Sequence, residues 1–241
     1  MLKEWTVFEK IWLIVSTLVI AGLAIYWKSS LISLIASITG ILCVVLVAKG
    51  KISSYYFGVV QAITYGYVCL TEYNLLGEAY LNLFIYLPLQ FIGLYLWTRK
   101  NNKKEDAEAI NGEDIYAKRL SFKQWAIMIV VIFVAYEICS NFLTSMNASM
   151  AGLDGLAVVM SVVAQVLMVL RFAEQWFLWI VVNVITITLW AIVLVQQGGN
   201  DWTIFAMWVA FLINSIYGYV NWLKISKQAA RDNVTNLEVQ I

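Results

Sequence analysis

Histidine is entirely absent from this 241-residue sequence. Its absence removes the side chain that most often binds metals, acts as a general base or relays protons. The three cysteines, Cys43, Cys69 and Cys139, lie in apolar stretches, and their spacing is typical neither of a zinc site nor of a disulfide framework. Clustered acids are lacking too, so little remains from which an active site could be built. We therefore expect no enzyme activity, no bound metal and no cofactor.

Charge is also scarce. Only 13% of the residues are charged, and the formal net charge is +1. A nucleic-acid-binding protein needs a basic face that neutralises several phosphates, so no nucleic-acid partner is expected. Apolar residues make up 62% of the chain and the mean hydropathy is +0.78, well beyond the values of soluble domains. The composition predicts an all-α polytopic membrane protein.

The apolar residues fall into eight blocks, each long enough to cross roughly 30 Å of hydrocarbon as a helix. We expect transmembrane helices over residues 7–27, 31–48, 54–71, 79–98, 122–140, 155–170, 175–196 and 202–223. Lysine and arginine are enriched in cytoplasmic loops, and a cytoplasmic N-terminus leaves only Lys28 outside. This separation predicts both termini in the cytoplasm and a place in a bacterial inner membrane. No cleavage pattern follows the first block, so it is expected to be retained.

The sequence also contains an internal repeat. Residues 59–64 (VVQAIT) match residues 181–186 (VVNVIT) at four of six positions, and the glutamine of the first copy becomes an asparagine in the second. Gly93 and Gly218 recur at nearly the same offset, each followed four residues later by a tryptophan. Chance similarity of apolar helices is the alternative to duplication. Because an intervening helix restores the direction of the chain, duplicated units of three helices would be parallel repeats, as in many transporters.

The predicted organisation is therefore an extra helix followed by a 3+1+3 arrangement. Its parts are an N-terminal extra helix (1–28), a first triple-helix repeat (29–98), a flexible charged cytoplasmic loop (99–121), a linker helix with an outer loop (122–154), a second triple-helix repeat (155–223) and a cytoplasmic tail (224–241).

Amide side chains inside the apolar blocks are costly in hydrocarbon and tend to face a bundle interior or a wet cavity. Several have an aromatic neighbour three or four residues away on the same helical face. Aromatic faces beside amides suit a planar heteroaromatic ring, and a cationic ring would gain cation–π attraction. Interhelical hydrogen bonding is the alternative role. The predicted substrate-binding residues are Gln61, Tyr86, Gln90, Trp179, Asn183, Asn214 and Tyr217.

No lysine or arginine lies in the middle of a predicted helix, so the permeant should lack a phosphate group, which would need such donors. Glu137 and Glu174 are the acids near apolar stretches, and neither forms a proton path. We therefore predict uncoupled, facilitated movement, although backbone carbonyls could still bind sodium. The single proline, Pro88, should kink the fourth helix.

Taken together, these residues resemble the PnuC family of vitamin transporters. The resemblance rests on Glu174, Trp179 and Asn183 in one helix and on residues 214–218 (NSIYG) in the last, and it covers roughly residues 31–223. It implies a full-length relative of the SWEET sugar transporters in the lipid bilayer, with nicotinamide riboside as small-molecule substrate. It also implies facilitated diffusion with trapping inside the cell by a riboside kinase. The role of the first helix and the formation of a homo-oligomer stay open.

Other functions compete with this one. Relatives in the group carry thiamine or riboflavin, and a sugar transporter of the SWEET type would place similar aromatic pairs around a pyranose. A retinal photoreceptor would need a lysine deep in its last helix, and none precedes Lys224. A receptor or assembly scaffold is the alternative outside transport, and it predicts that altering Asn183 changes no solute flux.

Overall fold

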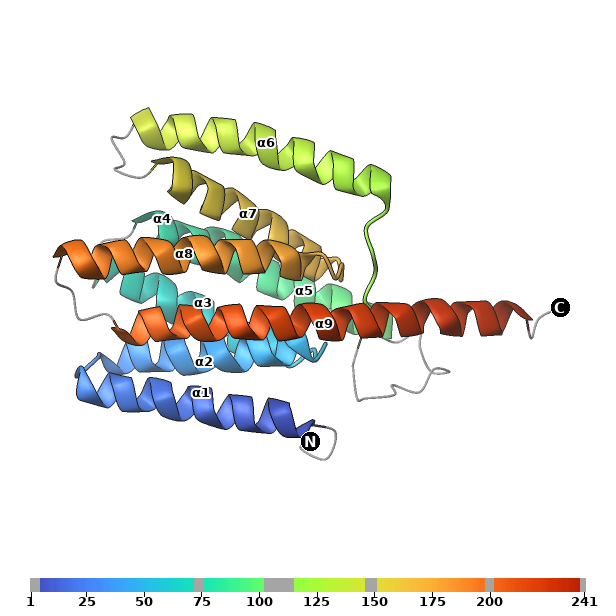
Figure 1. The fold of residues 1–241 in the computed structure, drawn as a ribbon, viewed down its shortest axis with the longest axis horizontal. Coiled ribbons are helices and arrows are strands. Elements are labelled where there is room, and N and C mark those ends of the chain that lie inside the picture. The colour runs from blue at the N-terminus through green and yellow to red at the C-terminus, as the bar shows by residue number, and fades with distance from the viewer. Residues whose placement is uncertain (1–4, 72–75, 102–114, 146–150, 198–201, 239–241) are drawn as a thin grey trace.

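The computed structural model describes residues 5–71, 76–101, 115–145, 151–197 and 202–238. These residues form one helical bundle (Figure 1). The helices are α1 (Val7–Tyr26), α2 (Leu31–Ala48), α3 (Ser54–Thr71), α4 (Leu76–Tyr80), the π-helix η1 (Leu81–Tyr86), α5 (Leu87–Asn101), α6 (Phe122–Ser145), α7 (Ala151–Val169), α8 (Gln175–Gln197) and α9 (Trp202–Glu238). The segments α4, η1 and α5 are consecutive and form one rod. The predicted all-α class is confirmed.

Several predicted boundaries move. The last helix does not end near residue 223 but continues to Glu238, because the segment after Lys224 is rich in residues that favour helix, such as lysine, glutamine, alanine and arginine. The helix predicted over 122–140 extends to Ser145. The helix predicted from residue 79 begins at Leu76, in what the sequence suggested was a polar loop.

Six segments of the described chain are long and apolar enough to cross a membrane. They are Val7–Tyr26, Leu31–Ala48, Glu78–Arg99, Phe122–Ser145, Ala151–Val169 and Gln175–Ile192. Helices α3 and α9 are not in this set; in α3, tyrosine and glutamine side chains interrupt the apolar run. Both nevertheless run alongside the six in the same bundle (Figure 1). Below, the end of the bundle where α1 begins is called the N-terminal end and the opposite end the far end.

The helices pack in two sets of matching contacts. In the first half α2 packs on α3 and α3 on α5, while in the second half α7 packs on α8 and α8 on α9. The halves meet through α2 against α9 and through α5 against α7. The flanking helices also correspond, because α1 packs on α2 and α6 packs on α7 (Figure 1).

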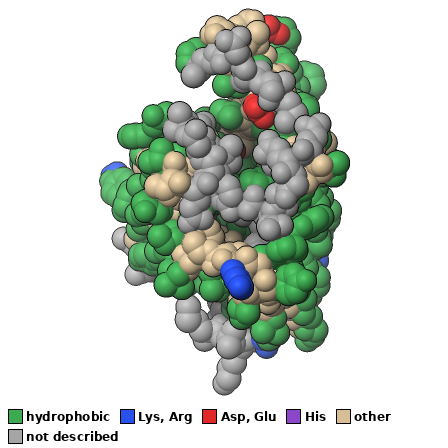
Figure 2. Space-filling view, turned by 90° about the vertical axis from the view of Figure 1, so that its left-hand side faces the viewer, with side chains coloured by type: hydrophobic (Ala, Val, Ile, Leu, Met, Phe, Trp, Pro, Cys, Tyr) green, Lys and Arg blue, Asp and Glu red, His purple; other side chains and the backbone are tan. Residues whose placement is uncertain are grey.

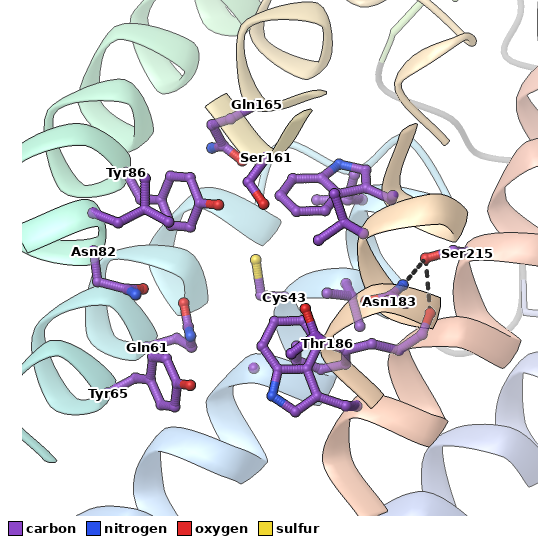
Figure 3. A pocket seen from close by; sticks show the side chains of 18 of the residues that line it. Cys43, Gln61, Tyr65, Asn82, Tyr86, Ser161, Gln165, Asn183, Thr186 and Ser215 are labelled. Carbon is purple, nitrogen blue, oxygen red and sulfur yellow. Dashed lines mark hydrogen bonds between the residues drawn. The ribbon is translucent and has the colours of Figure 1, made fainter. Parts of the chain in front are cut away.

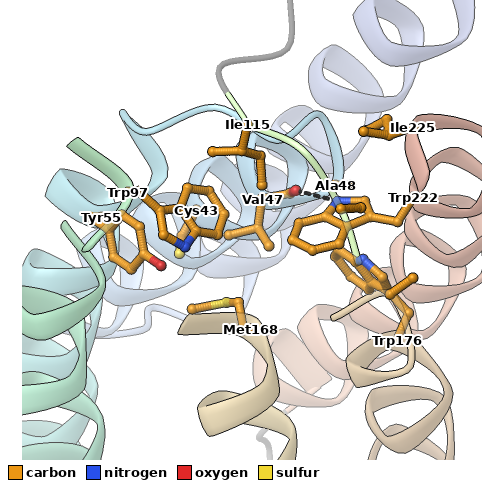
Figure 4. Packing of buried hydrophobic residues seen from close by; sticks show 12 residues of the cluster. Cys43, Val47, Ala48, Tyr55, Trp97, Ile115, Met168, Trp176, Trp222 and Ile225 are labelled. Carbon is orange, nitrogen blue, oxygen red and sulfur yellow. Dashed lines mark hydrogen bonds between the residues drawn. The ribbon is translucent and has the colours of Figure 1, made fainter. Parts of the chain in front are cut away.

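A cluster of buried aromatic residues joins the halves at the N-terminal end (Figure 4). The indole nitrogen of Trp97 in α5 donates to the carbonyl of Val169 in α7 at 3.1 Å, and that of Trp222 in α9 donates to the carbonyl of Val47 in α2 at 2.9 Å. Both tryptophans are fully buried, and their ring centroids lie 6.1 Å apart. Each half therefore hydrogen-bonds to the end of a helix of the other.

The N-terminal helix is fixed to both halves through Glu9. Thr6 and Glu9 form a capping box at the start of α1, and the buried Glu9 carboxylate pairs with Lys49 at 2.9 Å. The Tyr217 hydroxyl of α9 donates to the other carboxylate oxygen at 2.8 Å. Because Lys49 caps the end of α2, one carboxylate joins α1, α2 and α9.

The segment between α5 and α6 was predicted to be a flexible loop, and its described part, residues 115–121, is instead folded against the turn between α7 and α8. The Lys118 amide donates to the Arg171 carbonyl, and the Ala173 amide donates to the Lys118 carbonyl. Arg119 pairs at 2.6 Å with Glu174, which is completely buried. The first residues of the predicted loop, 99–101, belong to α5, and residues 102–114 lie outside the described part.

Candidate functional site

A cavity lies between the two halves of the bundle and encloses about 940 Å³ of space between the atoms, including its open part. Its walls combine aromatic rings with uncharged polar groups. The polar lining residues are Gln61, Asn82, Gln90, Ser161, Gln165, Asn183, Thr186 and Ser215, and the aromatic ones are Tyr65, Tyr86, Trp176, Trp179, Trp208 and Phe211.

Helix α8 supplies a part of the wall that is held by hydrogen bonds to α9. Trp179 and Asn183 both line the cavity, as their spacing of four residues predicts. The Asn183 amide nitrogen donates to the Ser215 hydroxyl of α9 at 2.9 Å, and that hydroxyl donates to the carbonyl of Phe211 (Figure 3). Only 2% of Asn183 is exposed, so this chain of hydrogen bonds fixes its orientation. The amide oxygen of Asn183 remains the group that can meet a ligand.

The rod of α4, η1 and α5 contributes one polar residue per turn. Glu78, Asn82, Tyr86 and Gln90 are spaced four apart and all line the cavity. The π-helical turn lies just before Pro88, which has no amide hydrogen to continue an α-helical ladder. The Leu87 amide donates instead to the carbonyl of Asn82, five residues earlier. The chain just before the proline is thus π-helical in the wall of the cavity, and the kink itself stays a prediction.

Helix α7 completes the wall with Ser161 and Gln165, which lie across the cavity from α3 and face Tyr86 (Figure 3). The Gln165 amide nitrogen and the Gln90 amide oxygen are buried and have no hydrogen-bond partner within the described part of the chain. A buried amide without a partner costs free energy of the order of 1–3 kcal/mol. A ligand that offers one acceptor and one donor would recover this free energy.

Five of the seven predicted site residues line the cavity, namely Gln61, Tyr86, Gln90, Trp179 and Asn183. Tyr86 and Trp179 come from opposite halves and meet at 6.3 Å between ring centroids. The remaining two lie outside the lining. Asn214 is fully buried and donates to the carbonyl of Val44, while Tyr217 binds Glu9. Their substrate-binding role stays a prediction that the geometry does not favour.

Five of the eight uncharged polar residues in the described lining were not predicted. Ser161 and Gln165 are one helical turn apart in the same predicted helix, and Asn82 lies four residues before Tyr86, so a search for polar residues at this spacing would have found them. It also overlooked Glu78, which we had assigned to a loop. The statement that Glu137 and Glu174 are the acids near apolar stretches was therefore wrong, because Glu78 lines the cavity.

The cavity is closed at the N-terminal end by side chains that also belong to the aromatic cluster of Figure 4. Cys43, Val47, Met168 and Trp176 contribute to both. Behind them, Ile115 and Ala117 of the 115–121 segment are buried in the same cluster. A molecule in the cavity is thus separated from the N-terminal end by this packed layer. Figure 2 views the far end, where the described side chains are mostly hydrophobic.

The described lining of the cavity contains an acidic residue but no basic one. No lysine or arginine contributes to the described lining, and Glu78 is its one carboxylate. Within the described ranges no group of three or more cysteine, aspartate or glutamate side chains could hold a metal ion. The arrangement can stack and hydrogen-bond an aromatic molecule, but it offers no cation to a phosphate.

Comparison with known proteins gives one consistent result. Residues 30–224 match the family described as nicotinamide mononucleotide transporter. The chain is 42% identical over 224 residues to the nicotinamide riboside transporter PnuC of Neisseria mucosa, covering 93% of this chain and 84% of that one. It is also 42% identical over 226 residues to PnuC of Haemophilus influenzae, covering 93% of each. A crystal structure of the vitamin B3 transporter PnuC superposes with a TM-score of 0.82 at 41% identity, covering 93% of this chain and 94% of that one.

Proposed function

The chain belongs to the nicotinamide mononucleotide transporter family, and we propose on this basis that it carries nicotinamide riboside across a bacterial inner membrane. The observation that carries the proposal is the cavity between the halves, where Asn183 is held by Ser215 beside the ring pair of Tyr86 and Trp179. Nicotinamide riboside has an aromatic ring for the ring pair, and its carboxamide and ribose hydroxyls match the amides of the wall.

The family description names the mononucleotide, whereas the relatives are named for the riboside. The lining favours the riboside. A phosphate would have to enter a cavity whose described lining contains Glu78 and no cation, so it would lose its hydration without gaining an ion pair. The riboside differs only in lacking that phosphate.

For the mechanism we infer eight membrane-crossing segments, with the rod of α4, η1 and α5 counted as one, and two parallel triple-helix repeats that alternate access to the cavity. The matched packing of α2, α3 and α5 with α7, α8 and α9 supports this arrangement. With the N-terminal end in the cytoplasm, the conformation described here is closed toward the cytoplasm. Movement would then be facilitated diffusion, with a cytoplasmic kinase trapping the riboside as its phosphate.

Calorimetric titration of the detergent-purified protein tests the substrate. We expect it to bind nicotinamide riboside, and not the mononucleotide, thiamine or glucose. Asn183→Ala should abolish most of this binding, because it removes the amide oxygen that faces the cavity. Asn141→Ala is the matched control, since Asn141 is exposed on α6. Binding of thiamine or glucose instead would overturn the substrate, and binding of none of them would favour a scaffold.

A further inference from the structure

The one carboxylate in the cavity wall is Glu78, in the first turn of α4 at the far end of the bundle. It forms no ion pair with any residue in the described part of the chain. Asp154, in the first turn of α7, is a second acidic residue at this end of the bundle. The far end of the bundle therefore has one acidic residue from each half.

A carboxylate in such a place is costly unless a cation accompanies it, because the surrounding helices and aromatic rings replace water. The other features of the wall favour a cation as well. Tyr86 and Trp179 offer aromatic faces, which attract cations, and the Gln90 amide oxygen is an acceptor without a donor. No lysine or arginine belongs to the described lining of the cavity. A cationic ligand would therefore meet no repulsive positive charge there.

We propose that Glu78 selects the charge of the permeant, so that a planar aromatic cation is accepted and a neutral molecule of the same shape is disfavoured. This inference rests on the proposed transport of nicotinamide riboside, whose pyridinium ring carries one positive charge. The reduced riboside has a dihydropyridine ring in the same position, with the same carboxamide and ribose and no charge. The two ligands differ mainly in the property that Glu78 would recognise.

The test measures the affinities of both ligands by calorimetry for the unaltered protein, Glu78→Gln and Glu137→Gln. Glu137→Gln is the matched control, because Glu137 is an exposed carboxylate on α6. The unaltered protein and the control should bind the oxidised riboside at least about tenfold more tightly than the reduced one, which corresponds to roughly 1.4 kcal/mol. In Glu78→Gln the affinity for the oxidised form should fall about tenfold, while that for the reduced form stays nearly constant.

Each other outcome refutes a defined part of the reasoning. If the unaltered protein binds both forms equally, or if Glu78→Gln retains the preference, charge selection is wrong and riboside transport still stands. If the unaltered protein binds neither form, the proposed function fails as well. If the affinity for the riboside changes steeply when sodium replaces potassium, Glu78 would instead bind a coupled cation. The ligand preference of the unaltered protein tests the proposal by itself. The proposal therefore stays testable even if Glu78→Gln folds poorly.

Discussion

Gly218 in α9 lies against the indole of Trp176, and a methyl group there should damage both stability and binding. A Cβ atom at this position would lie 2.7 Å from three atoms of the fused ring system. Trp176 is 2% exposed and packs edge-on against Trp222, whose indole nitrogen is hydrogen-bonded to α2. The ring cannot retreat into this cluster, so it can move only toward the cavity that it lines.

The magnitude follows from two opposing terms. Overpacking a well-packed site costs about 1–3 kcal/mol, whereas replacing glycine by alanine inside a helix gains about 1 kcal/mol. Gly22 in α1 provides the comparison, because a Cβ there would meet no atom within 4 Å. Gly22→Ala should therefore be neutral or stabilising. The gain in helix propensity from glycine to alanine is the same in both variants and cancels in the comparison. Gly218→Ala should therefore be less stable than Gly22→Ala by about 1–3 kcal/mol.

This difference in stability can be measured by thermal unfolding of both variants in detergent, with the loss of the monodisperse protein peak as the readout. Riboside titration of the folded fraction measures the effect on the cavity, and we expect weaker binding only in Gly218→Ala. Equal melting temperatures for the two variants would refute the close packing of Trp176. Lower stability with unchanged binding would instead show that the displaced ring does not enter the cavity.

Three further predictions concern the contacts at the N-terminal end. Trp222→Phe loses one buried hydrogen bond to a backbone carbonyl and should lower the free energy of unfolding by about 1–3 kcal/mol, measured by thermal melting. Glu9→Gln should destabilise by about 3–5 kcal/mol by the same assay, because it removes the negative charge that pairs with the buried Lys49; adding Lys49→Met should recover much of the loss, and no recovery would contradict the pairing. Glu174→Gln should speed hydrogen exchange in residues 115–121 without affecting α3, because it weakens the ion pair that holds this segment.

Much of the helical framework could be predicted from the sequence, because crossing a bilayer requires an apolar run of fixed length. Helix α2 begins and ends at the predicted residues, and α3 does so as well. Trp179 and Asn183 were found because an aromatic residue and an amide four apart share one helical face. These predictions depend on periodicity along a single helix.

The features that could not be predicted depend on contacts between distant segments. Glu174 was interpreted only as an acid near an apolar stretch, yet it is fully buried because the segment before α6 folds back over it. Tyr217 has the spacing expected of a site residue, but Glu9, more than 200 positions earlier, accepts its hydrogen bond. Neither partner could be identified without knowing which helices adjoin.

Helices α1 and α6 occupy matching positions, so each can be grouped with the three helices that follow it instead of being treated as an extra helix and a linker. α1 packs on α2 and α6 on α7, each along the outer side of its half (Figure 1). The first turn of α1 pairs through Glu9 with Lys49 at the end of α2, and the chain that leads into α6 pairs with the backbone of Arg171 just after α7. The contacts divide the described helices into two sets, with α1, α2, α3 and the rod in one and α6, α7, α8 and α9 in the other. We therefore expect residues 1–101 and 115–241, expressed as separate chains, to reassemble as a heterodimer.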